Sequence, residues 1–301
     1  MSKEKWGKVL IIGDTIVDVY IDVVVRGICP EAVCTDVLPT EKREVYLGGA
    51  GNIYRQLAKL GTPCMLMTVT GAVSHELNNR FEALFNTFDT KMFPILRTLV
   101  EDYKLTTKIR YMCGDQMTYR VSDEETEYFE YKYIEPILAI AENVIDDFEV
   151  VLLVDYNKGM MIPKLIQQVI KVAKEKKVPV VSDIKYKNVG YYNNSFVIKC
   201  NQKEYDAIDC KPYSSYWIVT NGNKPTKMIT GNQIHEINTI TNPYFKNANC
   251  AGDIFMAGFV NAIVNNEDLG GGCDSIVIKD AISAGNTLAS KSLSKIKDKV
   301  V

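Results

Sequence analysis

The sequence predicts an α/β fold in which a mostly parallel sheet is covered by helices on both faces. Short segments at 9–14, 150–155 and 178–183 are apolar at nearly every position and end in an acid. Such runs are typical of parallel strands that are buried on both sides. Segments with helical spacing of apolar residues lie between them, and strand and helix alternate along most of the chain. This alternation favours a parallel sheet with helices on either side.

In the first half of the chain, two segments have a strand pattern without a long helix. Residues 15–46 are rich in Val, Ile and Thr, and residues 106–121 return to that pattern. We expect these segments to be insertions that pair into a small sheet beside the main one. The other elements predicted here, each from its apolar run or stripe, are a strand at 9–14, a helix that opens at 47–52 and ends at Gly61, a strand at 65–69 and a helix at 76–88.

The second half repeats the strand–helix alternation more regularly. Leu165, Ile166, Val169, Ile170 and Ala173 form an apolar stripe at helical spacing, which indicates a core-facing helix. In chain order, the predicted elements are a helix near 137–144, a strand at 150–155, a helix at 165–173, strands at 178–183, 196–198 and 217–220, and helices at about 251–264 and 276–294.

The composition indicates a folded protein that is nearly neutral. Of the 301 residues, 47% are hydrophobic and 24% are charged, and the formal net charge is -2. We therefore expect one domain over 1–301, with no nucleic-acid or membrane partner. The eight cysteines form no C-x-x-C pair and there are only two histidines, so no zinc site is expected. Without a signal peptide or a segment of membrane-spanning length, the protein is expected to be cytoplasmic with reduced thiols.

The segment 247–259 carries the strongest chemical signal. Small residues lead directly into an apolar helix, and Asp253 stands at the turn between them. The first N–H groups of a helix are unpaired and carry partial positive charge, so small residues there let a phosphate approach closely. An aspartate at that point can accept the proton of a hydroxyl that attacks the phosphate. The segment predicts a phosphoryl-transfer centre; the alternative is an acid that stabilises a helix N-terminus.

Two groups of polar or small residues follow predicted elements in the first half. Asp14 and Asp18 come after the first strand, where they can bind the hydroxyls of a polyol or act as turn acids. Residues 48–51 are small, and Asn52 follows them, so the backbone there can approach a sugar that Asn52 binds. The alternative is a simple helix N-terminal loop. The spacing does not fit a dinucleotide fingerprint.

Two further segments follow strands in the second half. Asn201 with Glu204 three residues later resembles a capping box, and Glu204 also suits a position near a hydrated Mg²⁺ beside a triphosphate. Thr220 and Gly222 lie at a strand-to-turn junction that can meet a nucleotide or be merely a turn. No P-loop and no protein-kinase motif set is present, so phosphoryl transfer requires another fold.

Seven short motifs follow one another along the chain: GDTIVD at 13–18, CPEA at 29–32, LGGAGN at 47–52, TKIR at 107–110, DYNKG at 155–159, SDIK at 182–185 and NQKE at 201–204. Together with the 247–259 segment, their order resembles the ribokinase/PfkB family of carbohydrate kinases over nearly the whole chain. Within that family, the sequence is most similar to the heptose 7-phosphate kinase domain of ADP-heptose synthase proteins. Because the sequence ends after this domain, we expect no attached nucleotidyltransferase half of the kind found in those proteins.

The resemblance implies a ribokinase-like, doubly wound sheet with a small β-lid over the sugar, formed by the insertions at about 15–46 and 106–121. It also implies ATP and Mg²⁺, and a homodimer through the lid. By motif position, Asp253 would be the catalytic base. The backbone N–H groups around it would form the anion hole, at Cys250, Ala251, Gly252 and Asp253.

The resemblance also distributes the other candidate residues between two ligands. The sugar would be held by Asp14, Asp18, Gly48, Gly49 and Asn52, with the lid cations Lys108, Arg110 and Arg120 available for a phosphate on the substrate. The nucleotide would be met by Lys185, Asn201, Glu204, Thr220 and Gly222, and Glu204 would also serve the metal through water.

The closing motif departs from the family pattern D-x-T-G-A-G-D. Asn247, Asn249 and Cys250 replace its first Asp, Thr and first Gly. If that glycine has positive φ, Cys250 costs roughly 1–2 kcal/mol there, and its side chain crowds the γ-phosphate. Asp253 itself is retained.

The first hypothesis is an ATP-dependent sugar kinase. Its best substrate would be D-glycero-D-manno-heptose 7-phosphate, phosphorylated at the anomeric hydroxyl. A second hypothesis, motivated by the altered motif, is a catalytically weak or inactive sugar- or nucleotide-binding protein on the kinase fold. A third keeps the chemistry but changes the substrate to another sugar or a nucleoside.

Overall fold

The structure is a computed structural model that describes residues 7–73, 75–88, 92–240, 250–266 and 274–293. Its main sheet has nine strands. They are β1 (Val9–Gly13), β4 (Cys64–Ala72), β5 (Ile95–Lys104), β8 (Val150–Val154), β9 (Val180–Asp183), β10 (Ser195–Asn201), β11 (Ser214–Asn221), β12 (Lys224–Thr230) and β13 (Gln233–Ile237). Their order is β13-β12-β11-β10-β9-β8-β1-β4-β5, in which only the pairings of β12 are antiparallel.

The sheet reverses its direction of growth at β1. The chain moves from β1 through β4 to β5 on one side, and then from β8 through β11 on the other. Gly13 ends β1 in register with Val154 at the end of β8. In an open α/β sheet, ligands bind outside the carboxyl ends of the strands at such a reversal. The topology therefore places the expected site at this edge.

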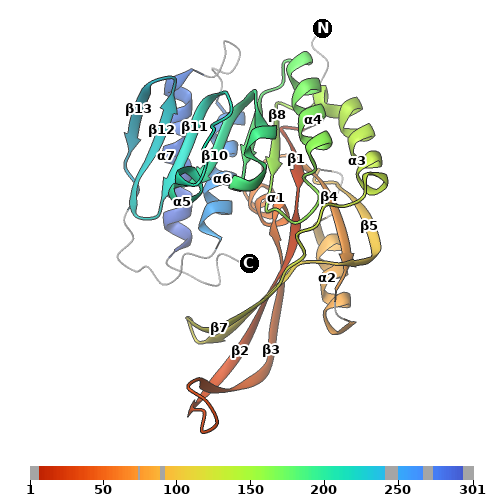
Figure 1. The fold of residues 1–301 in the computed structure, drawn as a ribbon, viewed down its shortest axis with the longest axis vertical. Helices are drawn as coiled ribbons and strands as arrows, with labels where there is room; N and C mark the ends of the chain where they lie inside the picture. Colours follow the sequence, from red (N-terminus) through yellow and green to blue (C-terminus); the bar gives the residue numbers. More distant parts are fainter. Residues whose placement is uncertain (1–6, 74, 89–91, 241–249, 267–273, 294–301) are drawn as a thin grey trace.

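Helices cover both faces of the sheet (Figure 1). They are α1 (Ala50–Lys59), α2 (His75–Phe88), α3 (Tyr131–Val144), α4 (Pro163–Glu175), α5 (Gln202–Asp206), α6 (Ala251–Val264) and α7 (Ser275–Ser292), with 3₁₀ turns at Ile145–Asp147 and Tyr186–Tyr192. Side chains of β1 alternate between two cores: Leu10 and Ile12 pack with α3 and α4, whereas Val9 and Ile11 pack with α1, α6 and α7. The predicted fold class, a doubly wound and mostly parallel sheet with helices on both faces, is confirmed.

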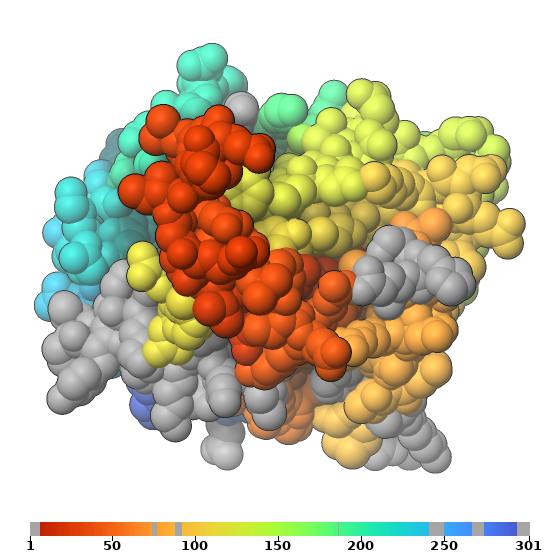
Figure 2. All heavy atoms as spheres, turned by 90° about the horizontal axis from the view of Figure 1, so that it is seen from below, coloured from red at the N-terminus to blue at the C-terminus, as the bar shows by residue number. Residues whose placement is uncertain are grey.

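A second sheet of four strands forms beside the first. Its strands are β2 (Thr15–Ile28), β3 (Thr35–Gly49), β6 (Thr107–Cys113) and β7 (Gln116–Asp123), in the order β3-β2-β6-β7. The segments predicted as insertions thus pair with each other, β2 and β6 in parallel. The long β2–β3 hairpin extends away from the main sheet in Figure 1, and it lies in front when the molecule is seen from below in Figure 2.

Several elements differ from the sequence expectation. The apolar patterns gave no strand at β5, β12 or β13, which are edge or near-edge strands with many half-exposed residues. Such strands lack the continuous apolar run of a buried strand. Helix α3 begins at Tyr131 and contains Pro136, rather than beginning near 137. Proline is favoured in the first turn of a helix, so the pattern places the start of this helix near Pro136 and omits the residues before it.

Candidate active site

Asp253 lies in the first turn of α6 and is only 5% exposed. Its carboxylate accepts a hydrogen bond of 2.8 Å from Asn52 Nδ2 on α1, and another from the Tyr156 hydroxyl. The carboxylate is therefore held by side chains from two other parts of the chain, beyond any role in stabilising its own helix. This arrangement fixes the orientation of a buried carboxylate at the edge of the sheet where a ligand is expected.

The start of α6 presents backbone N–H groups beside Asp253. The first hydrogen bond of the helix runs from the Ile254 N–H to the Cys250 carbonyl oxygen, at 3.0 Å. The N–H groups of Ala251, Gly252 and Asp253 consequently precede the intrahelical ladder. Cys250, the residue before the helix, has φ 61°, in the left-handed region. The positive φ expected at this position is thus present, and it is occupied by a cysteine.

Burial raises the pKa of the Asp253 carboxyl to about 6. The hydrogen bonds from Asn52 and Tyr156 oppose this shift, whereas the nearby charge of Asp183 adds to it. At neutral pH the carboxylate is largely ionised, yet it binds a proton far more readily than an exposed aspartate. A general base works best when its pKa lies near the operating pH.

A cavity of about 460 Å³ opens in front of this carboxylate. Most of the predicted site residues line it, although they come from widely separated parts of the sequence. They are Asp18, Gly49, Lys108, Arg110, Lys185, Asn201, Glu204, Thr220, Gly222, Cys250, Ala251, Gly252 and Asp253. Asn52 lies just behind and reaches the cavity through Asp253. Asn247 and Asn249 fall outside the described residues.

Asp14 has a different place from the one expected, because its carboxylate is turned into the protein. It is 2% exposed and accepts hydrogen bonds from the backbone N–H groups of Tyr156 (2.8 Å), Lys158 (3.1 Å) and Met160 (3.1 Å). Burial, and then the charge of Asp155, raise its pKa above the ordinary value. Asp14 therefore supports the loop after β8 rather than contacting a sugar.

On the lid side of the cavity, Asp18 forms a buried ion pair with Arg110 at 2.6 Å. Gly48 lies behind Asp18, where a Cβ would overlap its carboxylate, and it is not part of the cavity wall that the described residues form. Gly49 has φ +60° and precedes α1, so a side chain there would be strained. Arg120 is 45% exposed and pairs with Glu124 at 3.6 Å, outside the cavity.

On the opposite side, the expected capping box at α5 is present and shares a residue with the cavity. Asn201 accepts from the Glu204 N–H, and Glu204 Oε2 accepts from the Asn201 N–H at 2.8 Å. The other carboxylate oxygen of Glu204 accepts a 2.6 Å hydrogen bond from Lys185. Glu204 thus takes part in the capping box and also lines the cavity.

The sequence patterns did not single out three residues that line the site. Tyr156 and Asp183 lie within the DYNKG and SDIK motifs, whereas no pattern pointed to Lys199. Lys199 Nζ is paired with both oxygens of Asp183 at 3.0 Å and is buried. A Cβ at Gly252 would lie 3.4 Å from this ammonium group. Lys199 therefore adds positive charge beside the helix N-terminus.

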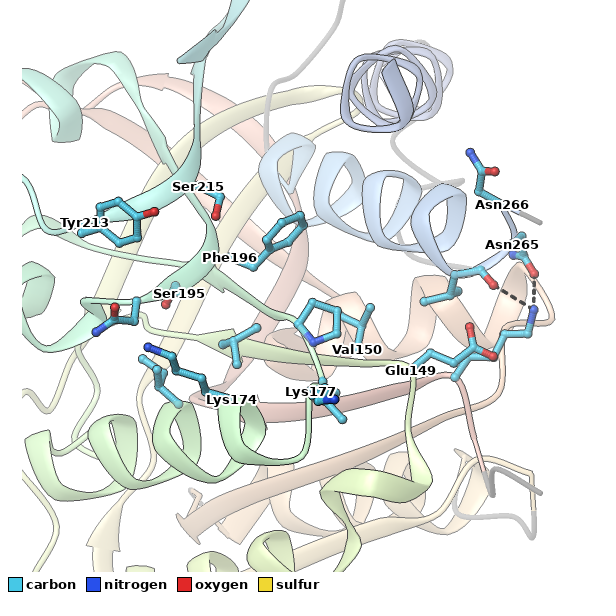
Figure 3. Close-up of a pocket in the computed structure, with 17 residues that line it drawn as sticks. Glu149, Val150, Lys174, Lys177, Ser195, Phe196, Tyr213, Ser215, Asn265 and Asn266 are labelled. Carbon is cyan, nitrogen blue, oxygen red and sulfur yellow. Dashed lines mark hydrogen bonds between the residues drawn. The ribbon is translucent and has the colours of Figure 1, made fainter. Parts of the chain in front are cut away.

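A larger cavity, of about 1110 Å³, lies at the other edge of the sheet (Figure 3). It is lined by residues at the amino ends of the parallel strands, including Val150, Val180 and Ser195. Lys8, which also lines this cavity, donates to the Val264 carbonyl (3.1 Å) and to Asn265 Oδ1 (2.6 Å). None of the predicted site residues lines this cavity. Size alone does not decide the site, because ligands of α/β sheets bind at the carboxyl ends.

Neither a membrane-spanning helix nor a metal-binding cluster is found among the described residues. No helix among them is long and apolar enough to cross a bilayer. Within the same part of the chain, no cluster of three or more His, Cys, Asp or Glu residues could hold a metal ion.

Comparison with known proteins gives the same fold and a related group of sequences. No family model matches the chain. The phosphofructokinase-2 structure from Escherichia coli superposes with a TM-score of 0.74 at 12% identity, covering 98% of this chain and 95% of that one. The ribokinase structure from Giardia lamblia gives a TM-score of 0.71 at 14% identity, covering 98% and 97%. The chain has the ribokinase-like fold of these structures.

Curated relatives of this ribokinase-like chain include proteins named bifunctional protein HldE. The protein from Geobacter metallireducens is 31% identical over 199 residues, which is 66% of this chain and 39% of the relative. The protein from Caulobacter vibrioides is 32% identical over 197 residues, 65% of this chain and 39% of the relative. The matched region thus spans about two fifths of these relatives.

In this ribokinase-like protein, replacing Cys250 by glycine should raise the free energy of unfolding. The left-handed conformation costs an L-residue roughly 1–2 kcal/mol, whereas glycine adopts it freely. The greater freedom of glycine in the unfolded chain offsets part of this, so we expect a gain of about 0.5–1 kcal/mol. Urea-induced unfolding measures it. Cys250→Ala is the matched control, because alanine keeps the strain; equal stabilisation by both changes would contradict the explanation.

Proposed function

We propose that the protein is an ATP-dependent sugar kinase, and that its substrate is D-glycero-D-manno-heptose 7-phosphate, phosphorylated at the anomeric hydroxyl. The observation that carries the kinase activity is the buried Asp253 carboxylate, oriented by Asn52 and Tyr156 beside the N–H groups at the start of α6. The fold and the HldE relatives support the kinase class. The choice of a heptose phosphate rests on the resemblance and on the cations that face the cavity.

In this proposal, Asp253 accepts the proton of the sugar hydroxyl as that oxygen attacks the γ-phosphorus in line with the leaving ADP. The N–H groups of Ala251, Gly252 and Asp253 stabilise the charge on the transferring phosphoryl group, and the Lys199 ammonium lies close enough to reinforce them. Such transfers require little covalent chemistry from the protein. Positioning and electrostatics supply most of the rate.

Magnesium fits this site only through its water shell. Glu204 uses one oxygen for the capping box and the other for Lys185, and Asp183 is paired with Lys199. Mg²⁺ commonly keeps several waters and needs only one or two carboxylates, so Glu204 can hold a hydrated ion while its present bonds remain. When bound, Mg²⁺ neutralises charge on the phosphate oxygens.

The phosphate of the substrate would be bound by cations at the lid. Lys108 and Arg110 line the cavity from β6, and Lys108 is 3.8 Å from Glu124. Burial lowers the pKa of Lys108, so a second negative charge from a phosphate would favour its charged form. Arg110 already compensates the buried Asp18 carboxylate. Lys108 is therefore the better residue for a test.

Lys108→Met should raise the KM for a sugar phosphate by about 10- to 100-fold, with a smaller change in kcat. A hydrogen bond to a charged group is worth about 1.5–3 kcal/mol, which corresponds to this range. Arg120→Met, which removes an exposed lid cation outside the cavity, is the control and should leave KM nearly unchanged. Steady-state kinetics measures both. An unchanged KM in Lys108→Met would favour a nucleoside or an unphosphorylated sugar.

A second candidate function is sugar or nucleotide binding with little catalysis. The left-handed Cys250 at the start of α6 motivates it, because its side chain stands where the family pattern has glycine. The activity of Cys250→Gly, and of the variant that also carries Asn249→Thr, separates the two readings. A large gain in kcat would mean that the natural site is impaired; no gain would mean that it is adapted to its own substrate.

We also propose that the protein is a cytoplasmic homodimer formed through the lid. The lid carries exposed apolar side chains at Val24, Leu38, Tyr119 and Val121, which are 54%, 53%, 63% and 38% exposed. These exposed apolar side chains are available for contact with a second copy of the chain. Sedimentation equilibrium should give twice the monomer mass, and a monomer at all concentrations would refute the dimer.

The function is tested by ADP release from Mg·ATP across a panel of sugars and sugar phosphates. Turnover on heptose 7-phosphate would support both the chemistry and the substrate. Turnover on another member of the panel would retain the kinase and replace the substrate. If no member of the panel gives ADP release while calorimetry still detects ATP binding, the result would favour a sugar- or nucleotide-binding protein with little catalysis.

A further inference from the structure

Two cysteines face each other at the far end of the lid hairpin. Cys29 directly follows β2 and Cys34 directly precedes β3, whose end residues Ile28 and Thr35 are paired. The Cys29 N–H donates to the Cys34 carbonyl oxygen at 2.8 Å, and the Cys34 N–H donates to the Ala32 carbonyl oxygen at 2.8 Å. Residues that oppose each other across an antiparallel pair lie about 4.5–5.5 Å apart at Cα, within the range of a disulfide.

The surroundings of the two thiols differ in a way that suits this chemistry. The backbone N–H of Glu31, and then that of Ala32 and the Cys34 thiol, hydrogen-bond to Cys29 and lower its pKa. The same thiol–thiol hydrogen bond raises the pKa of Cys34. Thiolates are the reactive form of cysteine, so Cys29 is the nucleophile of the pair and Cys34 its partner. Cys34 is exposed and Cys29 partly so, which leaves them open to solutes.

Three other cysteines of the described chain, Cys64, Cys200 and Cys210, lack this combination. Cys64 and Cys200 are buried, and burial raises the pKa of both thiols. Cys210 is exposed but lies after α5, far along the chain from the hairpin. It offers an internal control with similar access to solvent.

We propose that Cys29 and Cys34 form a redox-active dithiol, which a peroxide converts into an intrachain disulfide across the end of the lid. The Cys29 thiolate attacks a peroxide oxygen and the O–O bond breaks, which gives a sulfenic acid at Cys29 and a hydroxide ion; the proton released when the thiol ionised converts this hydroxide into one water. The Cys34 sulfur then attacks the Cys29 sulfur; the S–O bond breaks, the S–S bond forms, and a second water carries away the Cys34 proton. Overall, the two thiols lose two hydrogen atoms and hydrogen peroxide is reduced to two waters.

The bond would tie β2 to β3 at the end that lies farthest from the main sheet in Figure 1. It would leave the cavity residues untouched, because Asp18 and Gly49 lie toward the other end of these strands. The inference therefore does not depend on the kinase activity. Reduction by a small thiol would restore the two cysteines.

The test treats the reduced full chain with hydrogen peroxide, blocks the remaining thiols, and maps the disulfide by mass spectrometry. Arg26 and Lys42 place both cysteines in one tryptic peptide. That peptide should lose two hydrogen atoms in mass and become resistant to alkylation. In Cys34→Ser, Cys29 should instead be trapped as a sulfenic acid by dimedone. Cys210→Ser should leave the disulfide unchanged.

Alkylation of the untreated protein gives a second measurement. Cys29 should react faster than Cys210, because the hydrogen bonds that lower the pKa of Cys29 increase its thiolate fraction by more than they reduce its nucleophilicity. The proposal is overturned if the 27–42 peptide keeps both thiols at a peroxide dose that oxidises Cys210. It is also overturned if Cys29 and Cys210 are alkylated at equal rates.

Discussion

Asp253→Asn should lower kcat by about 10³-fold while ATP and sugar still bind. A positioned general base typically contributes 10²–10⁴-fold, and asparagine cannot accept the proton. The fold should tolerate the change, since the amide has the same shape and can still accept a hydrogen bond from Asn52 and donate one to Tyr156. Coupled measurement of ADP release gives kcat, and calorimetry gives the binding of ATP.

The matched control for this change is Asp209→Asn, an exposed acid outside the cavity, which should leave kcat unaltered. In the natural protein, kcat/KM should rise with pH and level off above about 6, because burial raises the pKa of Asp253 to that value. The folded state binds a proton at Asp253 more tightly than the unfolded state does. The contribution of Asp253 to the free energy of unfolding therefore falls as pH rises from about 4 to about 6. Equal turnover by Asp253→Asn would exclude the proposed mechanism.

Asp14→Ala should lower the free energy of unfolding by about 3 kcal/mol. It leaves the backbone N–H groups of Tyr156, Lys158 and Met160 without their acceptor, and each unsatisfied buried donor costs about 1–3 kcal/mol. Removal of a buried carboxylate offsets part of this loss. Because the same loop carries Tyr156, which donates to Asp253, kcat should fall as well.

Asp14→Asn should lose less stability than Asp14→Ala, because its remaining oxygen can still accept from this loop. Asp22→Ala removes a lid acid that pairs with Lys42 at 3.0 Å and is 40% exposed, so it should cost less than about 1 kcal/mol. Urea-induced unfolding of the three variants gives the ranking. A loss below 1 kcal/mol for Asp14→Ala would mean that water or loop movement satisfies these N–H groups.

The site residues differ in how far the sequence could reveal them. The position of Asp253 at a helix start, and the capping box of Asn201 and Glu204, follow from local patterns that the structure contains. Lys199 had no such signal, because a lysine within a strand is ordinarily read as a solvated residue. The sequence signal at Asp14 was misleading, since an acid at the end of a buried strand can turn toward a ligand or toward the next loop.

The sequence by itself determined the fold class and the order of its main elements. Apolar runs and helical stripes reflect which side chains must leave water, and that preference acts over a few residues. Only the tertiary structure decided which side chains meet. Asn52 donates to Asp253 from 201 positions away, and Tyr156 from 97. Such contacts depend on strand register and side-chain direction, which local patterns leave open.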